Sequence, residues 1–314
     1  MRTTGPCGRP PYDSPSALSA YLDAHGLAMS KRFGQNFLVN PDVRGRILEV
    51  LKSALAGCSG AARPGAEGGT GGEADPKSVR RVWEIGPGLG AMTAPVLDSG
   101  FELTAFEIDH GFARELGNIF GAEPRFSLIE GDFLDTWKGE FEKAGAPDLI
   151  FGNLPYNAAS AFIASLLEGF DGRGLEPPPF VFTVQKEAAA RMAAKPGCKD
   201  YSSFSVLCAV ETRVKLLFDL AGGSFWPVPR VTSSVVLMTP AASIAGRGGL
   251  AGFTAFVRSC FASRRKTLRN NAVAAGFDSE RVLDGLSRLG LPEASRAEAL
   301  SPVQLASLYR QLSV

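Results

Sequence analysis

The fold is decided by the stretch VRRVWEIGPGLG, residues 79–90. Its first half, residues 79–85, contains Val, Trp and Ile in a short run, which predicts a buried strand. Its second half contains three glycines, which allow a tight turn whose backbone can come close to a ligand. A helix is predicted to start at Thr93, so that its N-terminus faces the turn. The stretch therefore predicts a strand–turn–helix unit with a ligand site at the turn.

Strand-like and helix-like segments alternate around this unit. The predicted strands cover residues 79–85, 102–108, 126–130, 148–152, 180–185, 204–210 and 233–238. The predicted helices cover residues 16–25, 41–55, 93–97, 111–120, 159–168 and 186–192. Such alternation is typical of a mostly parallel sheet covered on both faces, and the last two strands, with no helix between them, predict an antiparallel edge. We therefore expect an α/β fold with a mostly parallel seven-stranded sheet.

The composition changes along the chain in a way that predicts domain boundaries. Residues 57–78 contain seven glycines and no Val, Ile, Leu, Met or aromatic residue, which predicts a disordered insert. Residues 241–252 form a Gly/Ala-rich linker, after which helices are predicted over residues 253–274, 279–289 and 301–312. The expected organisation is a leader with a short helix (1–28), a ligand-binding α/β domain (29–240) and a small C-terminal helical domain (241–314).

The composition also limits the possible chemistry. The chain has 314 residues, 45% hydrophobic and 21% charged, as expected of a globular protein with a sizeable core. Its five cysteines show no C-x-x-C spacing, which argues against a disulfide framework and a zinc knuckle. With two histidines, a histidine triad is not expected, and no metal site is expected either. Because no segment has the ~20 apolar residues of a membrane-spanning helix and no export signal is seen, we expect a cytoplasmic protein without a membrane partner.

Acidic residues lie at the carboxyl ends of the next two predicted strands. Glu107 lies at the end of strand 102–108, and Asp132 follows strand 126–130. Ligands of open α/β sheets bind at this edge. A carboxylate at Glu107 can accept both hydroxyl hydrogens of a ribose, and Asp132 can accept the amine of an adenine. These acids and the glycine turn predict an adenosine site, although the glycines alone would also fit a dinucleotide site or a turn without a ligand.

The sequence NLPY, residues 153–156, follows the fourth strand and distinguishes between adenosine ligands. The exocyclic nitrogen of adenine is a poor nucleophile because its lone pair is delocalised into the ring. The Asn153 side-chain oxygen and the Leu154 carbonyl can each accept an N–H bond from it, which frees the lone pair for attack on a sulfonium methyl. Pro155 fixes the turn, and Tyr156 offers a ring on which a base can stack. These four residues are the predicted catalytic residues; a plain strand-to-turn N-x-P is the structural alternative.

Eight stretches resemble, in order, the ribosomal RNA adenine dimethyltransferase family, which uses S-adenosylmethionine. They are RFGQNFL (32–38), EIGPGLG (84–90), EID (107–109), GDF (131–133), NLPY (153–156), QKE (185–187), WPVPRVTS (226–233) and CFASRRKTLRNN (260–271). The resemblance covers roughly residues 29–312 and leaves out the leader and the glycine-rich insert. The chain departs from the family at Thr232, where the family has Asp, and at Ser202, where it has Gly.

The resemblance implies a Rossmann-like methyltransferase with S-adenosylmethionine as its cofactor. The implied cofactor contacts are Asn36, Leu38, Gly86, Glu107, Asp132 and Asn153. Gln35, Ile108 and Phe133 are implied neighbours, with Phe133 against the adenine of the cofactor. The implied substrate is a pair of adjacent adenosines in the loop of the 3′-terminal helix of 16S ribosomal RNA, in a partly assembled small subunit, and each receives two methyl groups on N6. A monomer is expected.

Basic residues are concentrated in the C-terminal part of the chain. From Pro240 onward, ten Lys or Arg residues oppose five Asp or Glu residues. Arg258, Arg265 and Arg269 are expected to share one helical face that suits phosphates, with a merely solvated face as the alternative. Within the resemblance, the residues expected to contact RNA are Arg230, Arg258, Arg264, Arg265, Lys266 and Arg269.

Two other functions fit parts of the sequence. The adenine methylase of 23S ribosomal RNA that gives macrolide resistance shares the cofactor motifs and the turn at Asn153, but residues 226–233 and 261–271 favour the small-subunit branch. A non-catalytic ribosome-assembly factor or a mitochondrial-type transcription factor is the second alternative. Because Glu107 and Asp132 are intact, we do not expect that methylation has been lost.

Overall fold

The computed structural model describes residues 8–29, 35–57, 79–155 and 158–313, so the predicted insert lies almost entirely outside the described residues. The chain divides into two compact units. The first consists of Met1–Phe162, Pro178–Lys186 and Leu217–Leu237, and the second of Ile163–Pro177, Glu187–Leu216 and Met238–Val314. Within the described ranges, no helix combines the length and the apolar character that crossing a membrane requires.

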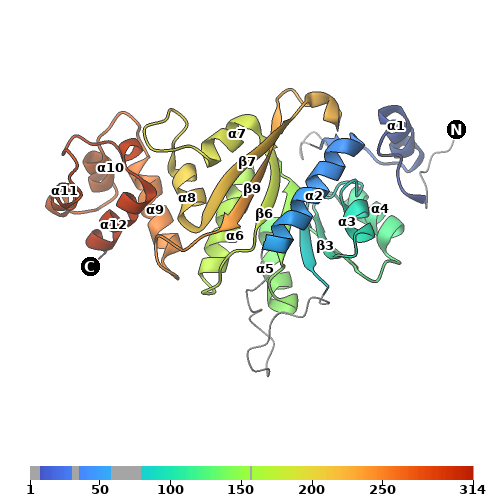
Figure 1. The fold of residues 1–314 in the computed structure, drawn as a ribbon, viewed down its shortest axis with the longest axis horizontal. Coiled ribbons are helices and arrows are strands. Elements are labelled where there is room, and N and C mark those ends of the chain that lie inside the picture. The colour runs from blue at the N-terminus through green and yellow to red at the C-terminus, as the bar shows by residue number, and fades with distance from the viewer. Residues whose placement is uncertain (1–7, 30–34, 58–78, 156–157, 314) are drawn as a thin grey trace, which may run out of the picture. The chain divides into compact units, whose positions relative to one another are not determined.

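A seven-stranded sheet with the order β4-β3-β2-β5-β6-β9-β7 is the central feature of the fold (Figure 1). Its strands are β2 (Arg81–Ile85), β3 (Glu102–Glu107), β4 (Phe126–Glu130), β5 (Leu149–Asn153), β6 (Phe180–Gln185), β7 (Thr212–Leu220) and β9 (Ser233–Pro240). The pairs β2–β3, β3–β4, β2–β5 and β5–β6 are parallel. The predicted α/β fold is confirmed. The strand order reverses between β2 and β5, which is where open α/β sheets bind their ligands.

The helices of the first unit are α1 (Pro15–Ala24), α2 (Pro41–Gly57), α3 (Thr93–Asp98), α4 (His110–Phe120) and α5 (Phe133–Ala144), and α6 (Ala159–Asp171) follows β5. Polar residues cap the N-termini of four of them, namely α1, α2, α4 and α5. The Asn40 side chain accepts a hydrogen bond from the Val43 N–H (3.1 Å), as the predicted helix start requires. Asp109 and Asp132 cap α4 and α5 in the same way. The carboxyl ends of β3 and β4 therefore lead directly into helix N-termini.

The core of the first unit consists of strand residues covered by helices. Val82, Leu103 and Leu149 lie on three neighbouring strands, and each is at most 1% exposed. They pack in one cluster with residues of flanking helices, such as Leu51 and Leu116. Burial of each such side chain contributes roughly 1.5–3 kcal/mol. Because both faces of the sheet are covered, the central strands read as continuous apolar runs.

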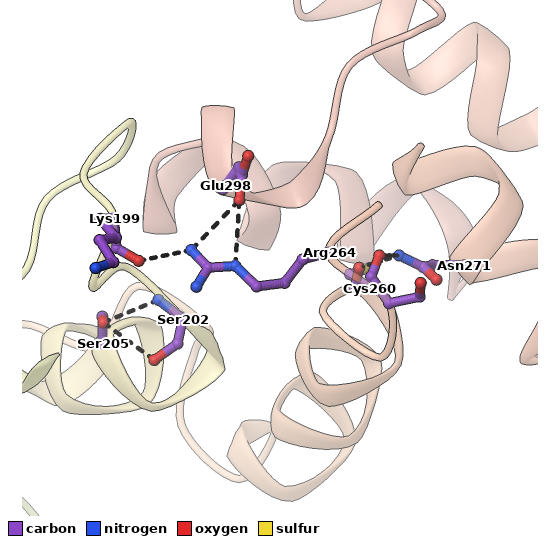
Figure 2. Close-up of polar contacts among 8 residues, drawn as sticks. Lys199, Ser202, Ser205, Cys260, Arg264, Asn271 and Glu298 are labelled. Carbon is purple, nitrogen blue, oxygen red and sulfur yellow. Dashed lines mark hydrogen bonds and ion pairs between the residues drawn. The ribbon is translucent and has the colours of Figure 1, made fainter. Parts of the chain in front are cut away.

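The apolar run 204–210 is a helix, not the predicted strand. Helix α8 spans Ser203–Glu211, and the strand begins only at Thr212. The Ser202 N–H donates to the Ser205 hydroxyl (3.0 Å), which satisfies a donor at the helix start (Figure 2). A short apolar run fits a fully buried helix as well as a strand, and here the serine cap decides. The predicted helix at 186–192, α7 (Lys186–Met192), is confirmed.

The C-terminal helices lie in the second unit and are shorter than predicted. They are α9 (Leu250–Cys260), α10 (Leu268–Ala274), α11 (Ser279–Arg288) and α12 (Pro302–Leu312) (Figure 1). The single helix predicted over 253–274 is wrong, because the chain leaves the helix between Cys260 and Leu268. Asn271, 5% exposed, donates to the carbonyls of Cys260 (2.7 Å) and Ser263 (3.0 Å) and so holds this break. Thr267 then caps α10.

The break between α9 and α10 also contradicts the prediction that three arginines share one helical face. Arg258 lies on α9, Arg265 lies in the connection between the helices, and Arg269 lies on α10. Since no continuous helix joins the three residues, the expectation that they share one helical face is wrong. We call residues 261–267 the basic loop.

Candidate active site

A cavity of about 260 Å³ lies at the carboxyl ends of β2, β3 and β5. The structure places all of the predicted cofactor residues on its lining: Asn36, Leu38, Gly86, Glu107, Asp132 and Asn153. The predicted neighbours Gln35, Ile108 and Phe133 line it as well. These residues are far apart in sequence and converge because parallel strands bring their carboxyl ends to one edge of the sheet.

The glycine turn after β2 needs glycine at two lining positions. Gly86 and Gly88 have φ angles of +66° and +60°, which other residues rarely adopt. A Cβ atom on Gly88 would lie 3.0 Å from the Phe37 ring, so β1 (Phe37–Leu38) packs closely against the turn. This strand pairs with β8 (Phe225–Trp226) in a separate two-stranded sheet. A side chain at Gly88 would press on the Phe37 ring, and a side chain at Gly86 would be strained by its φ angle.

Glu107 is 4% exposed and is held in place by two backbone groups. Its Oε2 accepts from the Gly88 N–H (2.9 Å), and its Oε1 accepts from the Asp109 N–H (2.8 Å). Burial raises the pKa of Glu107 to about 7, although the N–H groups of Asp109 and Gly88 oppose the rise. Each carboxylate oxygen has more than one acceptor position, so both can also accept ribose hydroxyls.

Glu84 is a second buried acid in the cavity that sequence reasoning did not single out. It is 3% exposed, and it accepts from the Thr93 hydroxyl (2.6 Å). Burial raises the pKa of Glu84 to about 8; the Thr93 hydrogen bond opposes the rise, and the charge of Glu107 adds to it. The signal available in the sequence was a single carboxylate between Trp83 and Ile85, in the strand that leads into the glycine turn.

Asp132 follows Gly131 and lies at the start of α5. Its Oδ1 accepts from the Leu134 N–H (2.9 Å), which makes it the cap of that helix. Its Oδ2 forms no hydrogen bond within the part of the chain that the structure describes. One carboxylate oxygen is therefore structural, and the other is available to a donor in the cavity.

The charges on the lining have one sign. Glu84, Glu107 and Asp132 are acidic, and the described lining residues include no Lys, Arg or His. A positively charged ligand would be stabilised by the acids and would lower their pKa values. The lining therefore favours a cationic adenosine compound.

Asn153 presents an acceptor without a partner. Its Nδ2 donates to the Asn36 carbonyl (3.1 Å), which fixes the orientation of the amide. Its Oδ1 is buried and has no hydrogen-bond partner among the described residues. A buried acceptor without a donor costs about 1–3 kcal/mol. An oxygen in this state at the cavity wall is suited to a ligand that brings an N–H donor.

The residues after Asn153 continue the wall. Leu154 is 1% exposed, and its N–H donates to the Thr183 carbonyl of β6 (3.0 Å), which anchors the turn to the sheet. Leu154 and Pro155 both line the cavity. Tyr156, the fourth predicted catalytic residue, lies outside the described residues.

The apolar part of the lining includes six phenylalanines. Phe133 contacts the ring of Phe106 edge-on (5.0 Å, 86°) and the ring of Phe162 (5.7 Å, 86°). Sequence reasoning named Phe133 but missed Phe106, Phe162 and Thr183, which also line the cavity. No motif marks these three residues, because a buried Phe or Thr in a strand or helix is typical of an ordinary core.

The predicted RNA-contacting residues differ in what they bind within the protein. Arg264 is exposed, yet its guanidinium donates to the Lys199 carbonyl (2.6 Å) and lies 3.5 Å from the Glu298 carboxylate (Figure 2). Arg269 donates to the Ser279 hydroxyl (2.9 Å), and Arg258 lies 3.8 Å from the Glu168 carboxylate. These three side chains therefore have structural partners in the second unit.

Arg265 and Lys266 form the accessible part of the basic loop. Both are exposed, and neither side chain has a hydrogen bond or ion pair with the described portion of the chain. Arg230 is exposed on the connection between β8 and β9, in the first unit. These three cations are available to an external anion, whereas Arg264 contributes to holding the loop in place.

Comparison with known proteins gives consistent matches over most of the chain. A family model described as "Ribosomal RNA adenine dimethylase" matches residues 26–313. A protein of Treponema denticola named "Ribosomal RNA small subunit methyltransferase A" is 39% identical over 297 residues, covering 93% of this chain and 92% of the relative. Proteins of the same name from Borreliella burgdorferi and Magnetococcus marinus are 36% and 35% identical, covering 83% and 91% of this chain and 82% and 93% of their own length.

Solved structures show a similar fold. A dimethyladenosine transferase from Plasmodium falciparum has a TM-score of 0.65 at 21% identity, covering 86% of this chain and 94% of its own. The 23S rRNA methyltransferase ErmE has a TM-score of 0.57 at 21% identity, covering 88% of this chain and 100% of its own. At this identity, the likeness supports the fold alone.

Proposed function

This chain belongs to the ribosomal RNA adenine dimethylase family, and from that premise we propose that it dimethylates N6 of two adjacent adenosines in 16S ribosomal RNA. The adenosines lie in the loop of the 3′-terminal helix, and S-adenosylmethionine is the methyl donor. We assign the reaction to a partly assembled small subunit in the cytoplasm, with the chain acting as a monomer.

The observation that carries the proposal is the unpartnered, buried Oδ1 of Asn153 on the cavity wall. The Asn36 carbonyl holds the amide so that its oxygen stays available. A preorganised acceptor of this kind needs no reorganisation when the reaction starts, which is the usual source of large electrostatic rate effects.

The cavity residues fit the proposed cofactor. Glu107 would hold the ribose hydroxyls, Asp132 would hold the adenine amine, and the glycine turn would let the backbone approach the ligand. The acids Glu84 and Glu107, without a basic residue among the described lining, suit a ligand that carries positive charge. When bound, S-adenosylmethionine supplies an electrophilic methyl group on a sulfonium sulfur.

The protein's own part in the reaction is to hold the target amine. Asn153 Oδ1 and the Leu154 carbonyl each accept one N–H bond from the adenine N6. These bonds draw the lone pair out of conjugation with the ring and orient the nitrogen. The proton released after transfer can pass to water, so no histidine is required. Pro155 keeps the Leu154 carbonyl in place, and Tyr156 is proposed as the stacking surface for the base.

The small-subunit substrate is supported by the relatives from Treponema denticola, Borreliella burgdorferi and Magnetococcus marinus, each of which carries a small-subunit name. The exposed Arg230, Arg265 and Lys266 are proposed to contact RNA phosphates, as are Arg258, Arg264 and Arg269. Phosphate contacts of this kind supply affinity rather than sequence choice.

The test is to incubate the purified chain with immature small subunits and methyl-labelled S-adenosylmethionine and to map the label on the RNA. We expect two adjacent adenosines near the 3′ end of 16S RNA, each with two methyl groups on N6. Label on 23S RNA, or on no RNA while the donor binds, would contradict the proposed substrate.

A further inference from the structure

The N-terminal segment Gly8–Leu27 is attached to the glycine turn that borders the cofactor cavity. Most of this segment precedes residue 26, where the family match begins. We propose that it is a positioning element for the cofactor, with the Tyr12 hydroxyl as the group that holds the turn. The inference rests on the proposed function, because it assumes that the cavity binds S-adenosylmethionine.

The direct contact is between Tyr12 and the turn itself. The Tyr12 hydroxyl donates to the Leu89 carbonyl (2.8 Å), and Leu89 lies between Gly88 and Gly90 of the turn. The Leu89 side chain is 0% exposed and packs in one cluster with Leu18 and Leu22 of α1. Both the backbone and the side chain of this turn residue are therefore held by the N-terminal segment.

Two arginines tie the same segment to elements around the cavity. Arg9 forms a bidentate pair with Asp98 at the end of α3 (2.7 and 2.8 Å), the helix that follows the turn. Arg44 of α2 pairs with Asp13, lies 5.6 Å above the Tyr12 ring, and donates to the Leu38 carbonyl of β1 (3.2 Å). The segment is thus linked both to the helix behind the turn and to the strand that carries a predicted cofactor residue.

Helix α1 is also fixed to α4, which begins beside Glu107. The Tyr21 hydroxyl hydrogen-bonds to the buried Glu115 of α4, and Figure 1 shows α1 near α3 and α4. A Cβ atom on Gly111, in the first turn of α4, would lie 3.3 Å from Leu27. The residue that caps α4 is Asp109, whose N–H donates to Glu107.

These attachments act on cofactor affinity through preorganisation. Glu107 and the glycine turn bind the ligand only in the geometry that the structure shows. If the turn loses an attachment, it visits other conformations. The observed cofactor affinity is then the intrinsic affinity multiplied by the fraction of molecules that keep the binding geometry. One neutral hydrogen bond is worth a few-fold in such an equilibrium.

The test compares two Tyr→Phe variants of the full chain. Tyr12→Phe removes only the hydroxyl that reaches Leu89. Tyr201→Phe is the matched control, because the buried Tyr201 hydroxyl also donates to a carbonyl, that of Leu300 (2.9 Å), but in the second unit. Calorimetry would give the dissociation constant of S-adenosylhomocysteine, and methylation assays would give kcat and the KM for S-adenosylmethionine.

We expect Tyr12→Phe to raise the dissociation constant and the KM by about two- to tenfold and to leave kcat at saturating donor unchanged. Tyr201→Phe should leave all three unchanged. Arg9→Gln, which releases a different attachment, should weaken binding further when combined with Tyr12→Phe. Wild-type affinity in Tyr12→Phe, or an equal loss in Tyr201→Phe, would overturn the inference while the proposed function stands. Failure of the wild-type chain to bind S-adenosylhomocysteine would instead remove the proposed function and this inference with it.

Discussion

The cavity of the first unit and the basic loop of the second unit hold their charged groups in opposite ways. In the cavity, Glu107 is buried and fixed by two N–H groups, and the Asn153 amide is fixed by one carbonyl. In the basic loop, Arg265 and Lys266 are exposed, and only Arg264 is held by the protein. Fixed, buried groups suit chemistry at a defined atom, whereas exposed cations suit a phosphate backbone whose position varies.

The contrast separates two kinds of effect. A change in the cavity should alter the rate or the cofactor affinity and leave the salt dependence of RNA binding as it is. A change in the basic loop should alter RNA affinity and its salt dependence and leave cofactor affinity as it is. Substitutions confined to one region therefore test whether these two kinds of effect are independent.

The largest effect is expected for Asn153→Ala. Loss of the unpartnered oxygen should lower kcat by about 10²–10³-fold, as loss of one preorganised acceptor or donor does elsewhere, while RNA affinity changes little. Single-turnover methylation of small-subunit RNA measures this. Asn118→Ala, in the exposed part of α4 and off the cavity, is the control and should keep wild-type turnover. Near-normal turnover of Asn153→Ala would show that the amide has no catalytic part.

Glu107→Gln should weaken S-adenosylhomocysteine binding by about 10–100-fold. The new NH₂ group would face a backbone N–H, either of Gly88 or of Asp109, and the charge-assisted bonds to the ribose would be lost. Glu102→Gln, at the exposed other end of β3, is the matched control. Equal affinities of the two variants in calorimetry would mean that Glu107 does not hold the ligand.

In the basic loop, the double variant Arg265→Ala/Lys266→Ala should weaken RNA binding by about tenfold or less near physiological salt. The slope of log K against log salt should fall by about 0.7–0.9 per residue, with unchanged melting temperature and cofactor affinity. Arg264→Ala should instead lower the melting temperature, since it removes the bonds to Lys199 and Glu298. Arg288→Ala, on the exposed end of α11, is the control. An unchanged salt slope in the double variant would place the RNA elsewhere.

The smallest effect concerns pH and Glu84. Burial raises the pKa of Glu84 from 4.5 to about 8, so between these values the folded state holds a proton that the unfolded state has lost. The unfolding free energy of the wild type should therefore fall, relative to Glu84→Gln, as pH rises from about 5 to 8, and then level off. Thermal unfolding of the two chains without ligand measures the difference, which should amount to several degrees across that range. Parallel pH profiles would show that Glu84 is ionised at neutral pH.

The same two regions show why the sequence predicted one better than the other. Glu107, Asp132 and Asn153 each end a strand, and in a parallel sheet those ends meet at one edge whatever the lengths of the connections. Their convergence on one cavity follows from strand positions alone. The strand-like run 79–85 and the glycines after it predicted the first strand and the turn from local sequence alone.

No comparable rule was available for predicting the structure of the second unit. The helix break after Cys260 depends on Asn271 reaching back to two carbonyls, which is a tertiary contact and leaves no periodic signal. The run 204–210 had the composition of a strand, and only the Ser202–Ser205 cap indicated a helix. The sequence did not indicate Glu84 either, because its raised pKa depends on the residues that bury it and not on its neighbours in sequence.

The central claim is that the cavity is a site for a cationic adenosine methyl donor. Its most direct test is calorimetric titration of the full, unmodified chain with S-adenosylhomocysteine and with S-adenosylmethionine near pH 7.5. We predict one molecule bound per chain for both compounds, with binding weakened in Glu107→Gln. Absence of binding, or binding that is indifferent to Glu107→Gln, would contradict this account.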